Sequence, residues 1–200
     1  MRVLLLAICV GSFAFPSSAV AEDDLAYCTV CHGAHGNGNY SIRAPKIAGM
    51  EPWYLRRQLE SFRSGRRGQH SDDAPGHEMR PVGIRLKSDA EITRAIDYVA
   101  TFEPKQPPAT IAGNVENGRM LYASCSACHG THGEGNEALG APALASRSDW
   151  YLLTQLVNFS LGIRGGDPAD VYGVQMRAAA ATLQNDEQRM DVVAYINTLR

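Results

Sequence analysis

The stretch CTVCHGAHGNG at residues 28–38 returns almost unchanged as CSACHGTHGEG at residues 125–135. A shift of 97 residues, applied without gaps, superimposes the two stretches and keeps matching the chain well beyond them. Agreement of this length indicates a tandem duplication of one domain of roughly 80 to 90 residues. The matched positions include Cys28 and Cys125, Cys31 and Cys128, His32 and His129, Pro45 and Pro142, Trp53 and Trp150, and Met79 and Met176.

The chain around this repeat divides into segments of different composition. Its first 21 residues, MRVLLLAICVGSFAFPSSAVA, contain one arginine, an apolar run and small residues at the end. This layout is typical of a secretory signal peptide, and we expect cleavage after Ala21. We expect the first domain at residues 22–103, a linker at 104–112 within the proline-rich stretch EPKQPPATIAG, and the second domain at 113–200. No later stretch approaches the ~18 consecutive apolar residues of a spanning helix, so we expect an exported, soluble and periplasmic protein.

Charge is distributed unevenly between the two copies. The whole chain has 19 basic and 21 acidic side chains, for a net charge of −2. Residues 22–105 contain 12 of each sign, whereas residues 106–200 contain 6 basic and 9 acidic side chains. This balance makes nucleic acid an unfavourable partner, and it makes one half of the protein neutral and the other acidic.

Apolar residues recur at helical spacing in both copies. Leu55, Leu59 and Phe62 fall at i, i+4 and i+7 between a proline and a glycine, and the second copy repeats the pattern from Leu152 to Gly162. An SDAE capping box opens a further helix in the first copy, and no segment alternates like a strand. The sequence therefore predicts an all-α fold of two tandem domains, each a few helices separated by long loops. A domain this small buries only ~60% of its unfolded surface, so a large apolar cofactor at its centre would help it to fold.

The repeated CxxCH pattern is the signature of covalent c-type haem. Two thiols form thioethers with the vinyl groups, and the following histidine ligates the iron. A disulfide oxidoreductase would need a βαβ surround, which the pattern lacks, and a zinc site in each domain has too few evident ligands. Structural disulfides in an exported protein remain the plain alternative. We therefore expect two covalently bound haem c groups, attached at Cys28, Cys31, Cys125 and Cys128, with His32 and His129 as iron ligands.

The sixth iron ligand separates electron carriers from catalysts, because an open position admits oxygen or peroxide. Among the methionines beyond the signal, only Met79 and Met176 match under the shift of 97 residues, and each stands 47 residues after its own CxxCH histidine. We expect these two to be axial ligands. His77 is the best alternative ligand to Met79, but it has no matching histidine in the second copy. His35 and His132 match each other, but they stand too close to the proximal histidines to reach the opposite face of the haem.

Together these motifs resemble the dihaem class I cytochromes c of the cytochrome c4 family. The resemblance covers nearly the whole mature chain and includes the strings APKIAG and APALAS and the helices WYLRRQLESFRSG and WYLLTQLVNFSLG. It implies two tandem cytochrome c domains whose irons are each held by histidine and methionine. It also implies that Pro45 and Pro142 offer carbonyl oxygens to the other nitrogen of His32 and His129. One departure is that NGRMLYASC precedes the second haem motif, whereas the first has only EDDLAYC after the expected cleavage site.

The resemblance implies a periplasmic electron-transfer protein and not an enzyme. Its implied partners are redox proteins: a quinol-oxidising complex or its cytochrome on one side and a terminal oxidase or reductase on the other, with peripheral membrane association through such complexes. An alternative is the dihaem electron-accepting subunit of a dehydrogenase, such as flavocytochrome c sulfide dehydrogenase. A dihaem peroxidase would need an open or histidine-gated iron, and a haem-free stapled protein would carry no covalent haem.

Arginines crowd the first domain. Arg67 has a matching arginine, Arg164, and the other arginines near it have none. The plain interpretation is a solvated helix face. The sharper hypothesis places Arg67 and Arg164 near haem propionates and makes Arg56, Arg57 and Arg63 part of a docking patch for an acidic redox partner.

Overall fold

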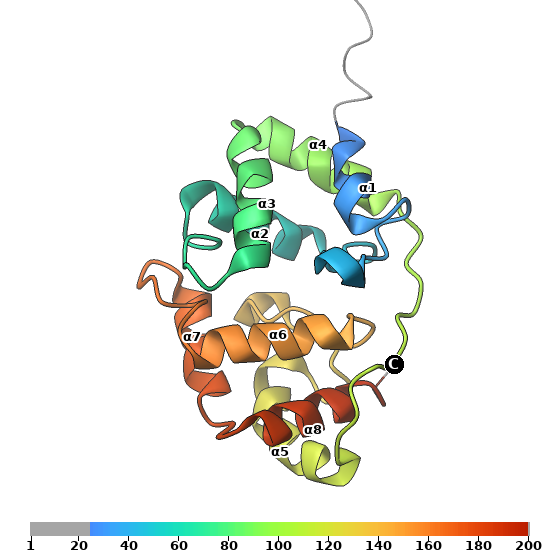
Figure 1. The fold of residues 1–200 in the computed structure, drawn as a ribbon, viewed down its shortest axis with the longest axis vertical. Coiled ribbons are helices and arrows are strands. Elements are labelled where there is room, and N and C mark those ends of the chain that lie inside the picture. Colours follow the sequence, from blue (N-terminus) through green and yellow to red (C-terminus); the bar gives the residue numbers. More distant parts are fainter. Residues whose placement is uncertain (1–24, 200) are drawn as a thin grey trace, which may run out of the picture.

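The structure, a computed structural model, describes residues 25–199. The expected signal peptide therefore lies outside the described residues. The described chain is all helical and forms two tiers, with α1 to α4 in the upper tier and α5 to α8 in the lower one (Figure 1). The predicted all-α fold is confirmed. Within the described residues, no helix is long and apolar enough to cross a membrane.

Among the residues that the structure describes in full, each tier has four α-helices and one named 3-10 turn. In the upper tier these are α1 (Tyr27–His32), η2 (Tyr40–Ile42), α2 (Pro52–Ser64), α3 (Ala74–Arg85) and α4 (Asp89–Ala100). In the lower tier they are α5 (Val115–His129), η3 (Glu137–Leu139), α6 (Asp149–Ser160), α7 (Val171–Ala180) and α8 (Asp186–Ile196). The β pairing found in residues 25–199 amounts to two isolated bridges, Asn39 with Ala44 and Asn136 with Ala141.

The boundaries of α2 and α4 follow from local sequence. Pro52 stands at the first turn of α2, where a missing N–H costs nothing, and Gly65 ends the helix with φ 82°. Ser88 opens α4 with the expected capping box: its hydroxyl accepts the Glu91 N–H at 3.2 Å, and the Glu91 carboxylate accepts the Ser88 N–H at 2.7 Å. Hydrogen bonds from Ser88 lower the pKa of Glu91. Both helices begin where the sequence predicts.

The helices α3 and α7 add to the sequence analysis, which named no helix at either position. Each is opened by an aspartate that accepts a backbone N–H three residues later: Asp73 from Gly76 at 3.1 Å and Asp170 from Gly173 at 2.9 Å. Glycines and prolines suggested a loop, but N-capping and packing against α2 and α6 outweigh these weak propensities. Met79 and Met176 therefore project from helices.

Each tier has its own apolar core. In the upper one, α2 packs against α3 and α4, and in the lower one α6 packs against α7 and α8 while α5 lies along α8. The buried residues of the upper core are Leu55, Leu86, Ile92, Ala95, Ile96 and Val99. Those of the lower core are Tyr122, Leu152, Leu156, Phe159, Ala180, Leu183, Val192, Val193 and Ile196.

The two tiers differ most in the helix that precedes the haem motif. In the lower tier α5 has 15 residues and crosses α8 so closely at Gly118 that a Cβ there would lie 1.9 Å from the carbonyl oxygen of Asp191. The Asp191 carboxylate also accepts hydrogen bonds from Asn114 N at 2.6 Å and Asn117 Nδ2 at 2.7 Å. In the upper tier α1 has only 6 residues, as the short EDDLAYC string predicts.

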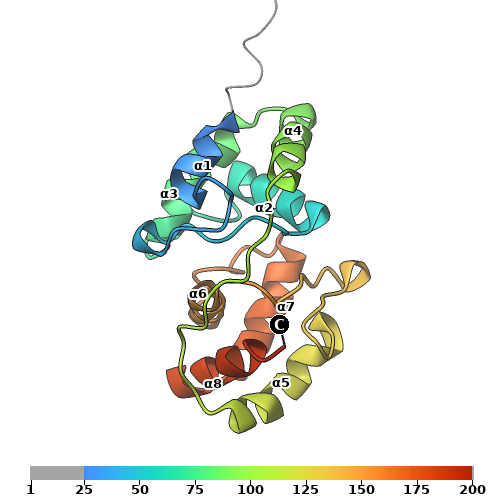
Figure 2. The same cartoon turned by 90° about the vertical axis from the view of Figure 1, so that its right-hand side faces the viewer.

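The proline-rich segment between α4 and α5 runs down one side of the molecule and joins the tiers (Figure 2). Its end is fixed by Asp149, a fully buried carboxylate at the start of α6. This carboxylate accepts hydrogen bonds from Ile111 N at 2.8 Å, from the Thr110 hydroxyl at 2.8 Å and from Asn197 Nδ2 at 3.1 Å. Burial alone would raise the pKa of Asp149, but these hydrogen bonds lower it.

Candidate functional site

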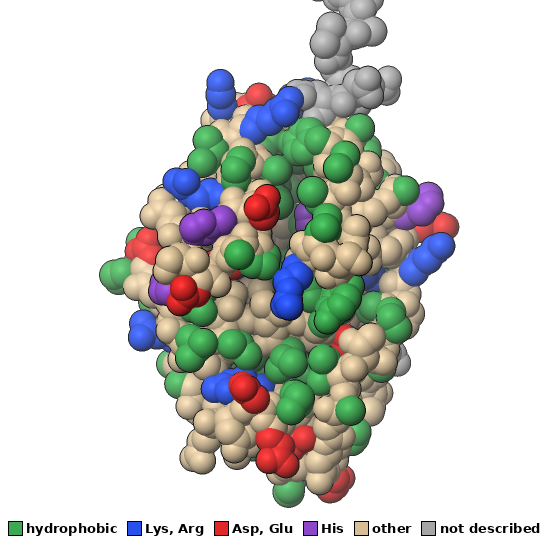
Figure 3. Space-filling model, viewed as in Figure 1, with side chains coloured by type: hydrophobic (Ala, Val, Ile, Leu, Met, Phe, Trp, Pro, Cys, Tyr) green, Lys and Arg blue, Asp and Glu red, His purple; other side chains and the backbone are tan. Residues whose placement is uncertain are grey.

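Each tier contains a cavity lined by its own CxxCH motif. The upper cavity has a volume of about 520 Å³ and is bordered by Cys28, Cys31, His32 and Met79. In Figure 3, hydrophobic side chains gather around a hollow in the upper tier. The lower cavity is narrower, about 200 Å³, and is bordered by the matching residues Cys125, Cys128, His129 and Met176. The structure thus brings the predicted residues of each copy together around one cavity.

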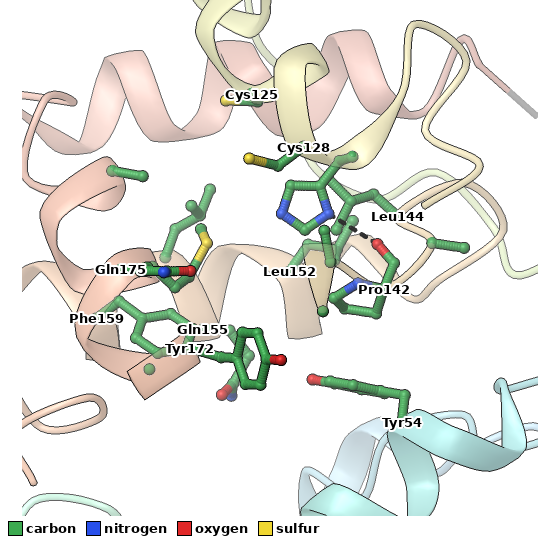
Figure 4. A pocket seen from close by; sticks show the side chains of 18 of the residues that line it. Tyr54, Cys125, Cys128, Pro142, Leu144, Leu152, Gln155, Phe159, Tyr172 and Gln175 are labelled. Carbon is green, nitrogen blue, oxygen red and sulfur yellow. Dashed lines mark hydrogen bonds between the residues drawn. The ribbon is translucent and has the colours of Figure 1, made fainter. Parts of the chain in front are cut away.

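The two motif histidines are buried and oriented by a proline carbonyl. His32 Nδ1 lies 2.7 Å from the Pro45 oxygen, and His129 Nδ1 lies 2.7 Å from the Pro142 oxygen (Figure 4). Burial lowers the pKa of both imidazoles, although the proline carbonyls oppose this shift. A neutral imidazole whose Nδ1–H donates to a carbonyl leaves its Nε2 lone pair free for a metal.

The cysteines offer free thiols beside the cavities. They stand three residues apart on α1 and α5, a spacing that puts both on one face of a helix. Figure 4 shows Cys125 and Cys128 on α5 at the edge of the lower cavity. Burial raises the pKa of Cys28 to about 11, and it raises that of Cys125 as well. Cys28 and Cys125 are therefore protonated at neutral pH, and all four cysteines are placed for covalent attachment of a ligand in the cavity.

The two methionines expected to ligate iron and the alternative ligand His77 lie in different environments. Met79 and Met176 are half-buried and border the cavities. His77 is exposed on α3 and borders neither cavity. His35 and His132 are exposed on loops.

Arg67 and Arg164 reach across the boundary between the tiers. Arg67 donates to Gln58 of its own tier at 2.9 Å and to the Tyr151 hydroxyl of the other tier at 3.0 Å. Arg164 mirrors it by donating to Gln155 of its own tier at 2.7 Å and to Gln58 of the other tier at 2.7 Å. The sequence analysis missed these glutamines and tyrosines, although polar residues matched under the shift within otherwise apolar helices were the available signal.

Tyr54 sits at the centre of this boundary. It comes from α2 of the upper tier and points its hydroxyl into the lower cavity (Figure 4). Burial alone would raise the pKa of Tyr54, but the nearby guanidinium groups of Arg164 and Arg67 lower it. Tyr54, Gln58, Tyr151 and Gln155 border both cavities, so the boundary forms a shared wall between them.

A second group of contacts at the boundary surrounds Glu51. Its carboxylate pairs with Arg147 at 3.1 Å and accepts the Ala143 N–H at 2.6 Å. Arg147 also donates to the Gly49 carbonyl at 3.0 Å, and the buried Lys46 donates to the Ser146 carbonyl at 3.1 Å. These contacts, whose donors come from both tiers, fix how the two cavities face each other.

The arginines proposed for a docking patch have different surroundings. Arg56 bonds the Thr93 hydroxyl at 2.6 Å, and Arg63 pairs with Asp89 at 3.3 Å. Arg57 is half-buried between the tiers and donates to the Gly140 carbonyl at 2.6 Å. The expectation of a solvated helix face is therefore wrong for Arg57.

The residues around each cavity fit a haem c group. The walls are mostly apolar, two thiols stand at one edge, and an imidazole nitrogen and a thioether are available for iron. In the upper cavity, Arg67 also has a buried Nε with no hydrogen-bond partner. An unpaired buried guanidinium donor is costly, and a ligand carboxylate such as a propionate would satisfy it.

Comparison with known proteins agrees with this fit. The cytochrome c family model matches the chain twice, at residues 23–103 and 115–200. Cytochrome c4 of Thiocapsa roseopersicina is 32% identical over 170 residues, covering 80% of this chain and 81% of that protein. A thiosulfate dehydrogenase electron acceptor of Thiomonas intermedia is 31% identical, covering 92% of this chain and 88% of that protein. The crystal structure of reduced cytochrome c4 from Pseudomonas stutzeri superimposes with a TM-score of 0.70 at 28% identity, covering 88% of this chain and 95% of that one.

Cytochrome c domains bind haem c covalently, so the chain carries two such groups. Both the matched model and the similarity to the named relatives extend over most of its length. The chain therefore belongs to the cytochrome c family, as a dihaem protein of the cytochrome c4 type built from two tandem cytochrome c domains.

Proposed function

We propose that this protein is a periplasmic electron carrier that shuttles electrons between a respiratory donor and a terminal oxidase or reductase. In this proposal Cys28, Cys31, Cys125 and Cys128 attach the two haems, His32 and His129 are the proximal ligands, and Met79 and Met176 are the distal ligands. The observation that carries it is that each cavity is bordered by two thiols, one buried imidazole and one thioether. Iron closed by histidine and methionine cycles between Fe(III) and Fe(II) with little rearrangement.

The protein's own groups would keep that exchange fast and reversible. The Pro45 and Pro142 carbonyls hold the imidazole rings in one tautomer and one orientation. The apolar helices around each cavity exclude water, which limits the reorganisation that accompanies a change of charge. The shared wall of Tyr54, Gln58, Tyr151 and Gln155 keeps the two cavities adjacent.

We propose a carrier and not a peroxidase because both cavities offer a thioether to the distal position. Met79 and Met176 border the cavities, whereas the exposed His77 does not. A catalyst would need an exchangeable position on at least one iron. The proposal also includes cleavage after Ala21, domains at 22–103 and 113–200, and a connecting linker at 104–112.

Optical spectroscopy of the mature protein, produced in a host that matures c-type cytochromes, tests this proposal. We expect covalent haem in both domains, a methionine-sulfur charge-transfer band in the oxidised form and no spectral shift of the reduced form with carbon monoxide. Met79→Ala and Met176→Ala should each open one site to carbon monoxide, while His77→Ala, the control, should not. Carbon monoxide binding by the unmodified protein would contradict the proposal.

A second candidate narrows the donor. Relatives from Thiomonas intermedia and Stutzerimonas stutzeri are named thiosulfate dehydrogenase electron acceptors, with 31% and 34% identity. We propose that a dehydrogenase of this kind is one donor for this chain. Stopped-flow mixing of the oxidised protein with a thiosulfate dehydrogenase and thiosulfate would show rapid reduction if so. Reduction only by a quinol-oxidising complex would exclude this donor and leave the general proposal standing.

A further inference from the structure

The two cavities differ in charge, although their ligand sets match. Two cations and two anions line the upper cavity, whereas three cations and one anion line the lower one. The charged residues of the upper cavity are Arg43, Arg67, Asp73 and Glu78, and those of the lower cavity are Arg57, Arg147, Arg164 and Asp170.

Much of this difference in charge disappears when equivalent residues and ion pairs are taken into account. Arg67 and Arg164 are counterparts under the shift of 97 residues, and so are the N-capping aspartates Asp73 and Asp170. Arg147 is compensated by the Glu51 carboxylate at 3.1 Å. The remaining difference in charge comes from Arg57 in the lower cavity. The upper cavity has instead two exposed residues of opposite charge, Arg43 and Glu78, which offset each other.

Arg57 belongs to the upper domain but lines the cavity of the lower one. Its guanidinium donates to the Gly140 carbonyl at 2.6 Å and lies 4.4 Å from the ring centroid of Tyr172, both residues of the lower domain. Tyr54 supports it from its own domain at 5.3 Å. The residue at the equivalent position of the lower domain is Thr154, which lines the upper cavity and is neutral.

No ion pair among the described residues neutralises Arg57, although the Asp170 carboxylate in the same cavity attracts it from beyond ion-pair distance. Its contacts are a carbonyl and aromatic faces. A guanidinium stays protonated at neutral pH even when it is partly buried. A half-buried cation is screened less by solvent than an exposed one, so it acts more strongly on a charge change nearby.

We propose that Arg57 raises the reduction potential of the haem in the second domain. One-electron reduction of Fe(III) to Fe(II) removes one unit of positive charge from that site, and a fixed cation beside it favours this change. The inference rests on the proposed function, because it requires two reversible one-electron sites.

Spectroelectrochemical titration of the holoprotein tests this inference. Arg57→Thr installs the residue of the equivalent position and removes the charge, so the potential of the second domain's haem should fall. We expect the equilibrium constant for electron exchange between the sites to change on the order of tenfold, ~59 mV for a one-electron couple. In Arg57→Lys the potential of the second domain's haem should stay close to that of the unmodified protein, because lysine keeps the positive charge although it loses the planar contact. Arg56→Gln, at the neighbouring arginine that lines neither cavity, should leave both potentials unchanged.

Assignment of the two waves comes from Met176→His, because a second histidine lowers the potential of the haem that it ligates relative to methionine. The wave that falls in this variant belongs to the second domain. Two unchanged waves in Arg57→Thr, or a shift of the first domain's wave alone, would overturn the inference while leaving the proposed function intact. An equal fall in the potential of the second domain's haem in Arg57→Thr and Arg57→Lys would mean that packing and not charge causes the effect, and it would also overturn the inference. Absence of two reversible waves in the unmodified protein would overturn the proposed function, and this inference with it.

Discussion

Arg67 and Arg164 bind the same oxygen: Gln58 Oε1 accepts a hydrogen bond from Arg67 at 2.9 Å and one from Arg164 at 2.7 Å. The two arginines are counterparts in the duplicated sequence, so equivalent residues of the two domains both reach across the boundary. Each guanidinium also stacks on a phenylalanine of its own domain, with Cζ 4.5 Å from the ring centroid. The duplication therefore created a nearly two-fold boundary from one set of residues.

Gln58→Leu should destabilise this boundary. The substitution leaves the buried Arg164 with one acceptor fewer, and an unsatisfied charged donor in a buried site costs roughly 2 kcal/mol. Urea unfolding of the holoprotein should show a lower midpoint, and the two domains should unfold less cooperatively. Gln106→Leu, at an exposed linker position, is the control. Equal midpoints for the two variants would mean that the bridge contributes little.

The sequence analysis named the cysteines, histidines and methionines that border the two cavities, but it did not reveal all of the helices or the boundary contacts that surround them. The CxxCH motifs, the paired methionines and the capping box are local or repeated patterns, and local patterns can be read directly from a chain. By contrast, α3 was hidden because Pro75, Gly76 and Pro81 resemble a loop, while tertiary packing makes the helix. Arg57 also looked like an exposed helix residue, because nothing in α2 alone reveals that Gly140 lies opposite it.

Gly118→Ala should disrupt the crossing of α5 and α8. The added methyl group would overlap the Asp191 carbonyl oxygen, and neither backbone can move without disturbing the core beneath it. Overpacking of this kind costs about 3 kcal/mol. Thermal unfolding followed by circular dichroism should show a lower transition temperature. Gly166→Ala is a suitable control because the added methyl group would lie 3.1 Å from its nearest neighbour, the Gly162 carbonyl oxygen, and the residue is exposed. A similar transition temperature in both variants would contradict the steric argument.

Asp149 should make the protein sensitive to acid. Its pKa is lowered in the folded state, so its contribution to stability is present above the ordinary aspartate value of about 3.9 and is lost as the pH falls through the folded value. Asp149→Asn should be less stable than the unmodified protein at pH 7, by roughly 1 to 3 kcal/mol, because the hydrogen bonds to an ionised carboxylate are lost.

Urea unfolding at several pH values measures this effect. The difference in unfolding free energy between Asp149→Asn and the unmodified protein should shrink as the pH falls below about 4, where the carboxylate of the unfolded chain gains its proton first, and should be smallest below the lowered pKa of the folded protein. Asp97→Asn, at an exposed position on α4, should show no such convergence. A constant difference across the pH range would instead attribute the loss to altered packing.

The first domain should open more readily than the second, because its leading helix is shorter. Arg94 and Asp97 are exposed on α4, whereas their counterparts Asp191 and Ala194 are buried on α8 beneath α5. Backbone amides protected by fewer packed neighbours exchange through lower-energy openings. Hydrogen exchange of the holoprotein should therefore show faster exchange in α4 than in α8, even though both helices begin with strong N-caps. Gly118→Ala should raise the exchange rate of α8 towards that of α4, since it weakens the cover that distinguishes them. Slower exchange in α4 than in α8 would mean that the boundary contacts, and not the leading helix, decide the relative stability of the domains.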